Sequence, residues 1–172
     1  MLANALQKNK FKRQSLFYLG RRYRLKVIAG TNTPPGVRLR GGYVEIVVEK
    51  RNPTLVRAAL NTWYRTRAKA VLSARLEELV ATLLWIRTPP PVRFQAMKVQ
   101  WGSCSPAGHL TLNPHLVKAP RECIAYVLLH ELCHLREHKH SRKFYRLLDV
   151  HMPRWQRRES RLDALADNLL NS

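Results

Sequence analysis

Five consecutive residues in the second half of the chain have the types and spacing of a metal site. They read His130-Glu131-Leu132-Cys133-His134, which is the pattern H-E-x-x-H. On a helix, a spacing of four residues places two imidazoles on one face, about one turn apart, so that a single ion can bind both. Neutral imidazole nitrogens suit zinc well. The pattern therefore predicts that His130 and His134 bind one Zn²⁺ ion.

Glu131 follows the first of these histidines directly. In this motif the glutamate reaches the metal-bound water rather than the metal, and it can accept a proton from that water. Zinc lowers the pKa of the water towards neutrality and polarises the carbonyl group that is attacked. We therefore expect Glu131 to be the general base of a metal-dependent hydrolysis.

A catalytic zinc needs a third protein ligand and an open position for water. His140 lies six residues after His134, which is the ligand spacing of the metzincin motif. That motif uses a glycine for the sharp turn, whereas Glu137 stands at this place here, so the chain must turn by other means. His138 is the alternative, but a continuing helix would carry it about 12 Å along the axis from His130. Geometry therefore favours His140 as the third ligand.

The three cysteines of the chain are Cys104, Cys123 and Cys133, and they form no C-x-x-C pair. An odd number does not suit a disulfide framework, so we expect reduced and mostly buried thiols. Cys104 lies in a Gly-Ser-Cys-Ser segment that could present a nucleophile, but no base is specified beside it, so packing or a backbone turn is favoured. Cys133 stands at i+3 from His130 and is expected in the core.

The group that stabilises the oxyanion is left open between His109, Tyr145 and His151, and the sequence favours a structural role for each of them. A second hypothesis is that the metal is purely structural. Structural zinc sites usually close with four protein ligands, and they have no need for a base such as Glu131. The catalytic interpretation is therefore preferred.

The elements that must position these residues begin with a sheet. Apolar and basic residues alternate over 22–27, and a second alternation over 37–48 is interrupted by Gly41-Gly42, which suits a tight turn. The segment 31–36 is composed of turn-forming residues. We predict an antiparallel sheet with one solvent-exposed face.

A long helical segment follows the sheet. From Pro53 onwards, leucine and aromatic residues recur at three- and four-residue spacing, which predicts one helix, or two joined near Lys69, ending before Pro89-Pro90-Pro91. The triple proline is a rigid connector. We therefore place the boundary between an N-terminal part (residues 1–88) and a catalytic part (residues 89–172) there, and expect the two to form one compact unit.

The catalytic part reads as a hairpin followed by three helices. The hairpin is expected from strands over 94–100 and 109–112, and the largely apolar helix that carries His130 opens at Pro120. Ser141 can cap the next helix, and a last helix begins near Trp155. The predicted fold class is α+β.

The formal net charge of the chain is +20. Residues 1–86 hold 17 Lys and Arg against 4 acidic residues, and residues 87–172 hold 14 against 7. Such a field attracts nucleic acid, anionic surfaces or acidic proteins, although charge alone does not identify a partner. Association with nucleic acid or nucleoprotein is therefore an expectation, with the positive charge concentrated in the N-terminal half.

Membrane insertion and secretion are not expected. No apolar run approaches the roughly 18 to 20 residues that a membrane span requires. The first 13 residues place their charges after a short, weakly apolar stretch and lack the pattern of a secretory signal. We expect a cytoplasmic protein, and the sequence does not indicate its oligomeric state.

Several segments together resemble the YgjP-like metal-dependent hydrolases, a zincin-type metallopeptidase family. The resemblance extends over about residues 18 to 162 and its motifs are specific. The matching segments are Leu19–Leu25, Trp63-Tyr64, Trp101–Ser105, Leu112-Asn113, Ala119-Pro120, Tyr126-Val127, His130–Leu135, His140-Ser141, Phe144 and Met152–Trp155.

The resemblance implies a minimal zincin core of hairpin, H-E-x-x-H helix and two C-terminal helices, acting on a protein or peptide substrate. It implies metal ligands at His130, His134 and His140 and a catalytic Glu131, with Lys139 as a small departure where members often have asparagine. A second departure is tyrosine at position 145, where members often have tryptophan.

SprT-like proteases, which act on proteins attached to DNA, are more distant relatives of this family. The alternatives are therefore a nucleic-acid-associated module with a structural metal, a protease acting on nucleic-acid-bound proteins, or an enzyme for a non-peptide amide.

Overall fold

The computed structural model describes residues 15–30 and 32–171. The expectation for the first 13 residues therefore lies outside the described part, as does Thr31 of the expected turn. Within the described part, every helix is too short or too polar to cross a bilayer.

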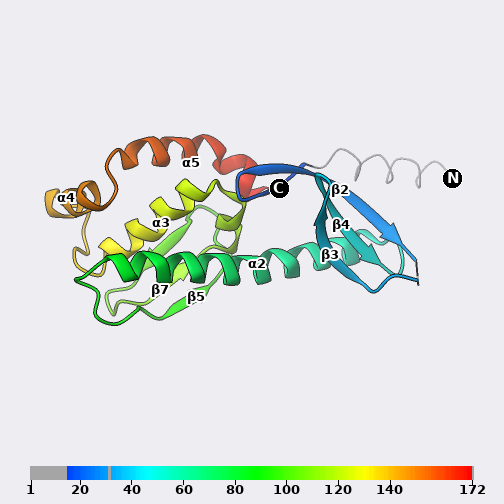
Figure 1. The fold of residues 1–172 in the computed structure, drawn as a ribbon, viewed down its shortest axis with the longest axis horizontal. Helices are drawn as coiled ribbons and strands as arrows, with labels where there is room; N and C mark the ends of the chain where they lie inside the picture. Colours follow the sequence, from blue (N-terminus) through cyan, green and yellow to red (C-terminus); the bar gives the residue numbers. More distant parts are fainter. Residues whose placement is uncertain (1–14, 31, 172) are drawn as a thin grey trace.

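A four-stranded sheet forms one end of the molecule (Figure 1). Its strand order is β1-β2-β4-β3. The strands are β1 (Ser15–Tyr18), β2 (Arg21–Ala29), β3 (Gly36–Arg40) and β4 (Tyr43–Val48).

The predicted sheet is confirmed, but its expected all-antiparallel pairing is wrong at one position. β2 and β4 run parallel, with Leu25 opposite Val44. The reason is the path of the chain: β3 occupies the outer edge, and the turn at Gly41-Gly42 then returns the chain between β2 and β3. Both glycines have positive φ, which this tight turn requires.

A single helix, α2 (Pro53–Thr82), follows the sheet. The side chain of Asn52 caps it by accepting a hydrogen bond from the backbone N–H of Thr54 at 2.8 Å, and Pro53 occupies the first turn. Of the two alternatives, the unbroken helix is confirmed. It extends from the N-terminal sheet to the far end of the helical part, where it lies beneath α3 and α5 in Figure 1. Its buried residues are Val56, Leu60, Tyr64, Ala68, Leu72 and Leu76.

The second sheet has the order β5-β7-β6. Its strands are β5 (Val92–Phe94), β6 (Gly102–Cys104) and β7 (Leu110–Leu112). A hairpin is present as predicted, because β6 and β7 pair antiparallel, but its first strand is β6 and not the expected segment 94–100. β5 instead pairs parallel to β7 at the other edge.

The expected first strand of the hairpin, residues 94–100, is wrong in its bounds. Only Phe94 lies in a strand, and β6 lies in the segment that was expected to be a loop. The amide of Asn113 explains the difference, since it donates hydrogen bonds to the carbonyls of Met97 and Gln100, each at 2.8 Å. These carbonyls are satisfied by a side chain instead of by a neighbouring strand.

The remaining elements are helical. They are the 3-10 helix η1 (Pro114–Lys118), α3 (Arg121–Cys133), α4 (Arg142–His151) and α5 (Trp155–Leu170). The predicted cap of α4 is confirmed, because the hydroxyl of Ser141 accepts from the N–H of Phe144 at 3.3 Å. α3 is buried along most of its length and lies between α2 and α5 (Figure 1). The α+β class is confirmed.

The N-terminal sheet is tied to the start of α3 by the turn between β1 and β2. The backbone N–H groups of Leu19 and Gly20 donate to the carbonyls of Val117 and Lys118, at 2.9 and 3.0 Å. Gly20 has a φ of +79°, and a Cβ there would lie 2.9 Å from the Cα of Pro120. One buried cluster therefore includes residues from both halves of the chain, and this core fixes the position of α3.

Candidate metal centre

Three histidine side chains converge at the end of α3. The Nε2 atom of His140 lies 3.0 Å from Nε2 of His130 and 3.1 Å from Nε2 of His134. His130 lies in the last turn of α3, His134 is the residue that caps the C-terminal end of this helix, and His140 comes from the loop before α4. Among the described residues these are the three side chains whose ligand atoms come close enough to hold one ion.

The geometry of this histidine cluster fits a zinc ion. Tetrahedral coordination with Zn–N distances of about 2.0 to 2.1 Å places ligand nitrogens about 3.3 Å apart. The observed separations of 3.0 and 3.1 Å are close to this value. Three imidazoles also match the donor set of a catalytic zinc with one further position for water.

The electrostatics of the cluster favour neutral imidazoles. Burial, followed by the neighbouring His134 and His140, lowers the pKa of His130 to about 4. Burial likewise lowers the pKa of His134. Nδ1 of His134 lies 3.1 Å from the carbonyl oxygen of Glu137, and donating to it leaves the Nε2 lone pair directed at the cluster. Neutral rings with free Nε2 lone pairs are what a metal ion requires.

The turn that brings His140 back is built without a glycine. After α3, the N–H of Glu137 donates to the carbonyl of Cys133 at 2.9 Å, and the N–H of Ser141 donates to that of Lys139 at 2.7 Å. No residue of this turn is among the described residues with positive φ. His138 is exposed and lies outside the histidine cluster.

Glu131 is buried beside the cluster, with 6% of its surface exposed. Burial raises the pKa of its carboxyl group to about 7. Its Oε2 atom has no hydrogen-bond partner among the described residues. A buried carboxyl oxygen without a partner costs free energy, and such groups occur where a ligand or a reacting molecule completes the site.

Gly102 on β6 lies directly against this glutamate. A Cβ at Gly102 would lie 2.8 Å from Cγ and 2.9 Å from Oε1 of Glu131. Only a residue without a side chain lets β6 approach the carboxyl group this closely. In the sequence, Gly102 could be read only as a residue that interrupts regular structure, because nothing local indicates that it faces Glu131.

Tyr126 contacts the Nδ1 side of the His130 ring, whereas the Nε2 atom of this ring faces the histidine cluster. Its hydroxyl lies 3.5 Å from Nδ1 of His130 and donates to Oε1 of Glu159 at 2.9 Å. Burial, followed by the hydrogen bond to Glu159, raises the pKa of Tyr126, so its hydroxyl remains protonated. Tyr126 stands four residues before His130, and this spacing alone could have indicated the contact. Glu159 comes from α5, and no local signal connects it to the site.

Replacing Tyr126 with phenylalanine should weaken zinc binding about 10-fold, because residues that orient a metal ligand typically contribute 10- to 100-fold in affinity. Competition with a chromogenic chelator measures the change. Tyr43→Phe, on the distant N-terminal sheet, is the matched control and should bind zinc like the wild type. An unchanged affinity in Tyr126→Phe would show that this hydroxyl does not orient His130.

A stack of aromatic rings holds His140. Tyr145 stacks on His140 with ring centroids 6.2 Å apart and on Trp155 at 5.5 Å, and Trp155 in turn stacks on Tyr126 at 6.0 Å. The indole N–H of Trp155 donates to Asp149 at 2.8 Å. Tyr145 of α4 and Trp155 of α5 therefore form a continuous stack of rings between His140 and Tyr126.

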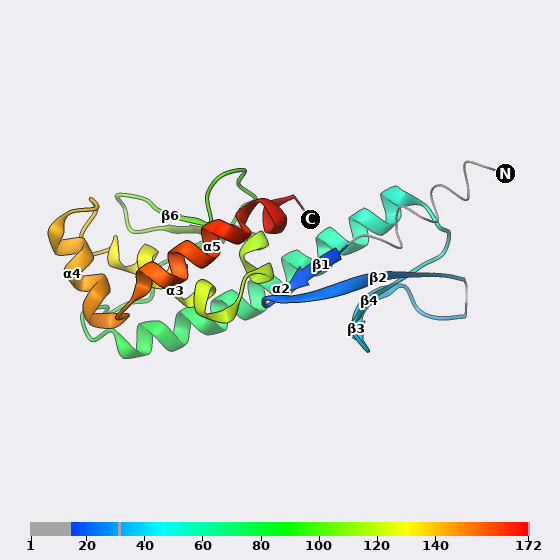
Figure 2. The same cartoon turned by 90° about the horizontal axis from the view of Figure 1, so that it is seen from above.

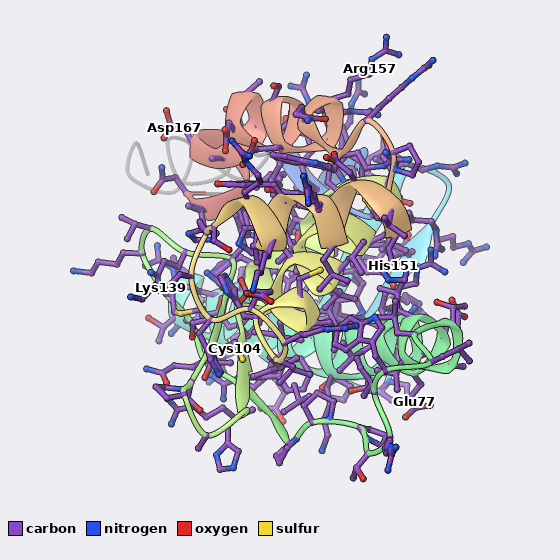
Figure 3. All side chains as sticks on the ribbon, turned by 90° about the vertical axis from the view of Figure 1, so that its left-hand side faces the viewer. Glu77, Cys104, Lys139, His151, Arg157 and Asp167 are labelled. Carbon is purple, nitrogen blue, oxygen red and sulfur yellow. The ribbon has the colours of Figure 1, made fainter. Side chains whose placement is uncertain are left out.

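The three oxyanion candidates lie in different places. Tyr145 contacts the cluster through the stack with His140. His109 is exposed on the turn between β6 and β7, and Nε2 of His151 accepts from the indole N–H of Trp85 at 3.2 Å. In Figure 3, His151 lies on one side of the molecule, whereas Cys104 and Lys139, the residue directly before His140, lie on the other side. Of the three, Tyr145 is therefore the one beside the cluster.

The cysteines behave as predicted. All three are free, and Cys123 and Cys133 are buried. Cys104 is half-buried, and burial together with the Glu131 carboxylate raises the pKa of its thiol. A protonated thiol is a weak nucleophile.

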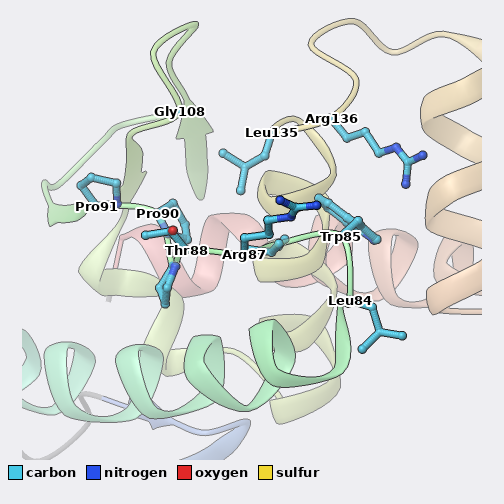
Figure 4. A pocket seen from close by; sticks show the side chains of 11 residues that line it. Leu84, Trp85, Arg87, Thr88, Pro90, Pro91, Gly108, Leu135 and Arg136 are labelled. Atoms are coloured by element: carbon cyan, nitrogen blue, oxygen red, sulfur yellow. The ribbon is translucent and has the colours of Figure 1, made fainter.

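A pocket of about 670 Å³ lies beyond the end of α3, next to Leu135 and Arg136 (Figure 4). Its other walls come from residues 84–91 and Gly108. Neither Glu131 nor any of the three clustered histidines lines it. The pocket is therefore separate from the metal centre.

Comparison with known proteins identifies one family. A family model described as YgjP-like, metallopeptidase domain, matches residues 2–165. No match is found among curated proteins. One similar solved structure is the metallopeptidase zymogen abylysin of Pyrococcus abyssi, with 29% identity, 56% of this chain and 93% of that chain covered, and a TM-score of 0.49. For the zymogen jannalysin of Methanocaldococcus jannaschii the values are 24%, 56%, 95% and 0.47.

Proposed function

Because this chain belongs to the YgjP-like metallopeptidase family, and is thus a metal-dependent hydrolase, we propose that it cleaves peptide bonds with one Zn²⁺ ion. The ion is held by His130, His134 and His140, and Glu131 is the general base. The observation that carries the proposal is the convergence of three imidazoles beside a buried carboxyl group whose Oε2 lacks a partner among the described residues.

A zinc ion bound there supplies Lewis-acid chemistry, which makes a coordinated water acidic and polarises the scissile carbonyl. Glu131 accepts the proton of the attacking water and then delivers it to the leaving amine. Burial raises the pKa of this carboxyl group above its ordinary value, which favours the uptake of a proton from the water. Tyr145 is the proposed donor to the oxyanion, since it stands beside His140.

We propose that an extended peptide binds along β6. This strand is at the edge of the order β5-β7-β6, so one side of its backbone is not used by the sheet. It also carries Gly102, which lies against Glu131. Strand addition would satisfy the peptide backbone and present the scissile bond to the carboxyl group.

A purely structural metal is the competing proposal, and the donor set argues against it. Structural zinc sites usually have four protein ligands, whereas the described residues offer a group of three. X-ray absorption of the zinc-loaded protein distinguishes the two. We expect nitrogen and oxygen neighbours at about 2.0 to 2.1 Å, and a sulfur neighbour at about 2.3 Å would indicate a closed structural site.

Replacing Gly102 with alanine should lower kcat about 10-fold or more while zinc remains bound. The new methyl group would displace the carboxyl group of Glu131, with which it would otherwise overlap, and a displacement of about 1 Å can cost up to 100-fold in rate. Gly36→Ala is the control, because a Cβ there meets nothing within 4 Å. Steady-state kinetics and zinc content measure both variants. A Gly102→Ala enzyme as active as Gly36→Ala would contradict the role of this contact.

Hydrolysis in ¹⁸O-labelled water tests the proposed reaction. An unfolded protein substrate is incubated with the zinc-loaded enzyme, and mass spectrometry follows its fragments. We expect fragments that carry one ¹⁸O atom at each new carboxyl group, and no fragments after zinc is removed with a chelator. An intact substrate with zinc-loaded enzyme would instead favour an enzyme for non-peptide amides or a structural metal.

A further inference from the structure

One face of the N-terminal sheet carries a concentration of positive charge. Side chains of β2 and β3 alternate between a face that packs on α2 and a face that points to solvent. We call the second one the basic sheet face. Its charged residues and its exposed ring are Arg22, Arg24, Lys26, Arg38, Arg40, Tyr43 and Glu45, and all five cationic residues are exposed. By the strand register, the apolar residues Phe17, Ile28 and Val47 share this face, and each of them is buried or half-buried.

The strand register places an aromatic ring between two arginines on this face. Arg24 of β2 lies opposite Tyr43 of β4, and Tyr43 lies opposite Arg40 of β3. Directly opposite residues share a face, and in an antiparallel pair such as Tyr43 and Arg40 their Cβ atoms are about 4.5 to 5.5 Å apart. Tyr43 is 36% exposed, so its ring is available to a ligand in the middle of this row.

The next row contains the acidic residue of the face. Glu45 binds Nζ of Lys26 at 2.8 Å and Nε of Arg38 at 3.4 Å, and its carboxylate is buried beneath them. The hydrogen bond from Lys26 is the main reason that the pKa of Glu45 is lowered. One carboxylate thus holds two cations in place. Arg24 and Arg40 form no ion pair within residues 15–30 and 32–171, and their charge is open to a ligand.

The opposite face of the sheet is the one that packs. Leu16, Leu25, Val44 and Ile46 belong to the hydrophobic core together with α2. In Figure 2, α2 runs along one side of the sheet, and η1 contacts its edge strand β1. The basic sheet face also lies at the opposite end of the molecule from α4 and the metal centre (Figure 1). A ligand on this face would leave the metal centre accessible.

We propose that the basic sheet face binds single-stranded nucleic acid, with a base stacked on Tyr43 and the backbone phosphates beside Arg24 and Arg40. Proteins that bind single strands combine a basic surface along the backbone with aromatic rings that stack on exposed bases. A duplex keeps its bases stacked inside and gains nothing from Tyr43. This proposal does not rest on the proposed peptidase mechanism.

Two other anionic partners fit the face less well. A membrane surface is usually bound by basic residues together with apolar side chains that insert into it, and Tyr43 is the one large exposed ring on this face. An acidic protein would pair with the arginines, but it would not require an aromatic ring between them. Single-stranded nucleic acid uses both kinds of side chain.

Fluorescence anisotropy with a labelled 20-nucleotide thymidine strand tests the stacking. Tyr43→Ala should weaken binding about 10-fold, since one stacked base typically contributes 5- to 150-fold. Tyr43→Phe keeps the ring and should bind within about 2-fold of the wild type, and thermal unfolding checks that both variants are folded. Wild-type affinity in Tyr43→Ala, or equal losses in both variants, would overturn the proposal.

The charge contribution is read from the salt dependence. Replacing Arg24 and Arg40 with glutamine should reduce the slope of log K against log salt by about 1.4, because each contact to a single strand contributes about 0.7. Lys143→Gln with Arg146→Gln on α4 removes the same charge and should leave the slope unchanged. An equal effect in this control would attribute binding to net charge alone. A polyglutamate peptide or phosphatidylserine vesicles bound with the same dependence on Tyr43 would also overturn the proposal.

Discussion

Glu131→Gln abolishes peptide hydrolysis while the protein still binds one equivalent of zinc. Glutamine keeps the shape of the side chain but cannot accept a proton, so the attacking water loses its base. General-base groups typically contribute 100- to 10,000-fold in rate, and we expect a loss in this range or larger. Initial rates of hydrolysis of an unfolded protein and zinc content by elemental analysis check the two parts of this result.

Glu77→Gln is a suitable control for this substitution. Glu77 is an exposed carboxylate on α2, and its replacement should leave both the rate and the zinc content unchanged. Substantial residual activity in Glu131→Gln would remove this residue from the role of base. If the zinc were lost together with the activity, Glu131 would instead contribute to metal binding.

His140→Ala removes zinc together with activity. Its Nε2 atom lies about equally far from those of His130 and His134, so its loss leaves two donors on one helix and no partner across the site. Loss of a group that only supports a ligand costs 10- to 100-fold in metal affinity, and loss of the ligand itself should exceed about 100-fold. Competition with a chelator of known affinity gives the value.

His138→Ala is the matched control, because it removes an exposed imidazole two residues earlier in the same turn. We expect this variant to bind zinc and hydrolyse substrate like the wild type. The opposite result, with zinc lost in His138→Ala and retained in His140→Ala, would assign the third ligand to His138.

The histidine cluster could be predicted from the sequence because its geometry is mostly local. The spacing of His130 and His134 places both rings on one face of any helix, and the structure has them there, at the C-terminal end of α3. His140 could be preferred over His138 from helical rise alone. The supporting contacts could not be predicted, since Glu159 reaches Tyr126 from another helix.

Strand pairing shows where the sequence is insufficient in the fold. The alternation over residues 22–27 and 37–48 predicts strands, but alternation is the same in parallel and antiparallel pairs, so the parallel pairing of β2 with β4 was missed. Residues 95–100 were expected to form a strand, yet the side chain of Asn113 takes up two of their carbonyls. Both outcomes depend on partners distant in sequence.

The two proposed surfaces are connected by α2, which contacts the N-terminal sheet and also packs against α3. The proposal for each surface can nevertheless be tested and rejected independently of the other. Variants of Tyr43 should leave hydrolysis of a free unfolded protein unchanged, because this residue lies at the other end of the molecule from the histidine cluster (Figure 1). Glu131→Gln should bind a single strand like the wild type.

The most direct test of the proposed chemistry is a zinc titration of the metal-free protein, with the rate of peptide hydrolysis followed at each addition. We predict that the rate of the wild type rises in proportion to zinc, levels off at one equivalent, and stays near zero throughout in Glu131→Gln. A rate that is independent of zinc, or an equal rise in Glu131→Gln, would contradict catalysis by Glu131 and one zinc ion at His130, His134 and His140.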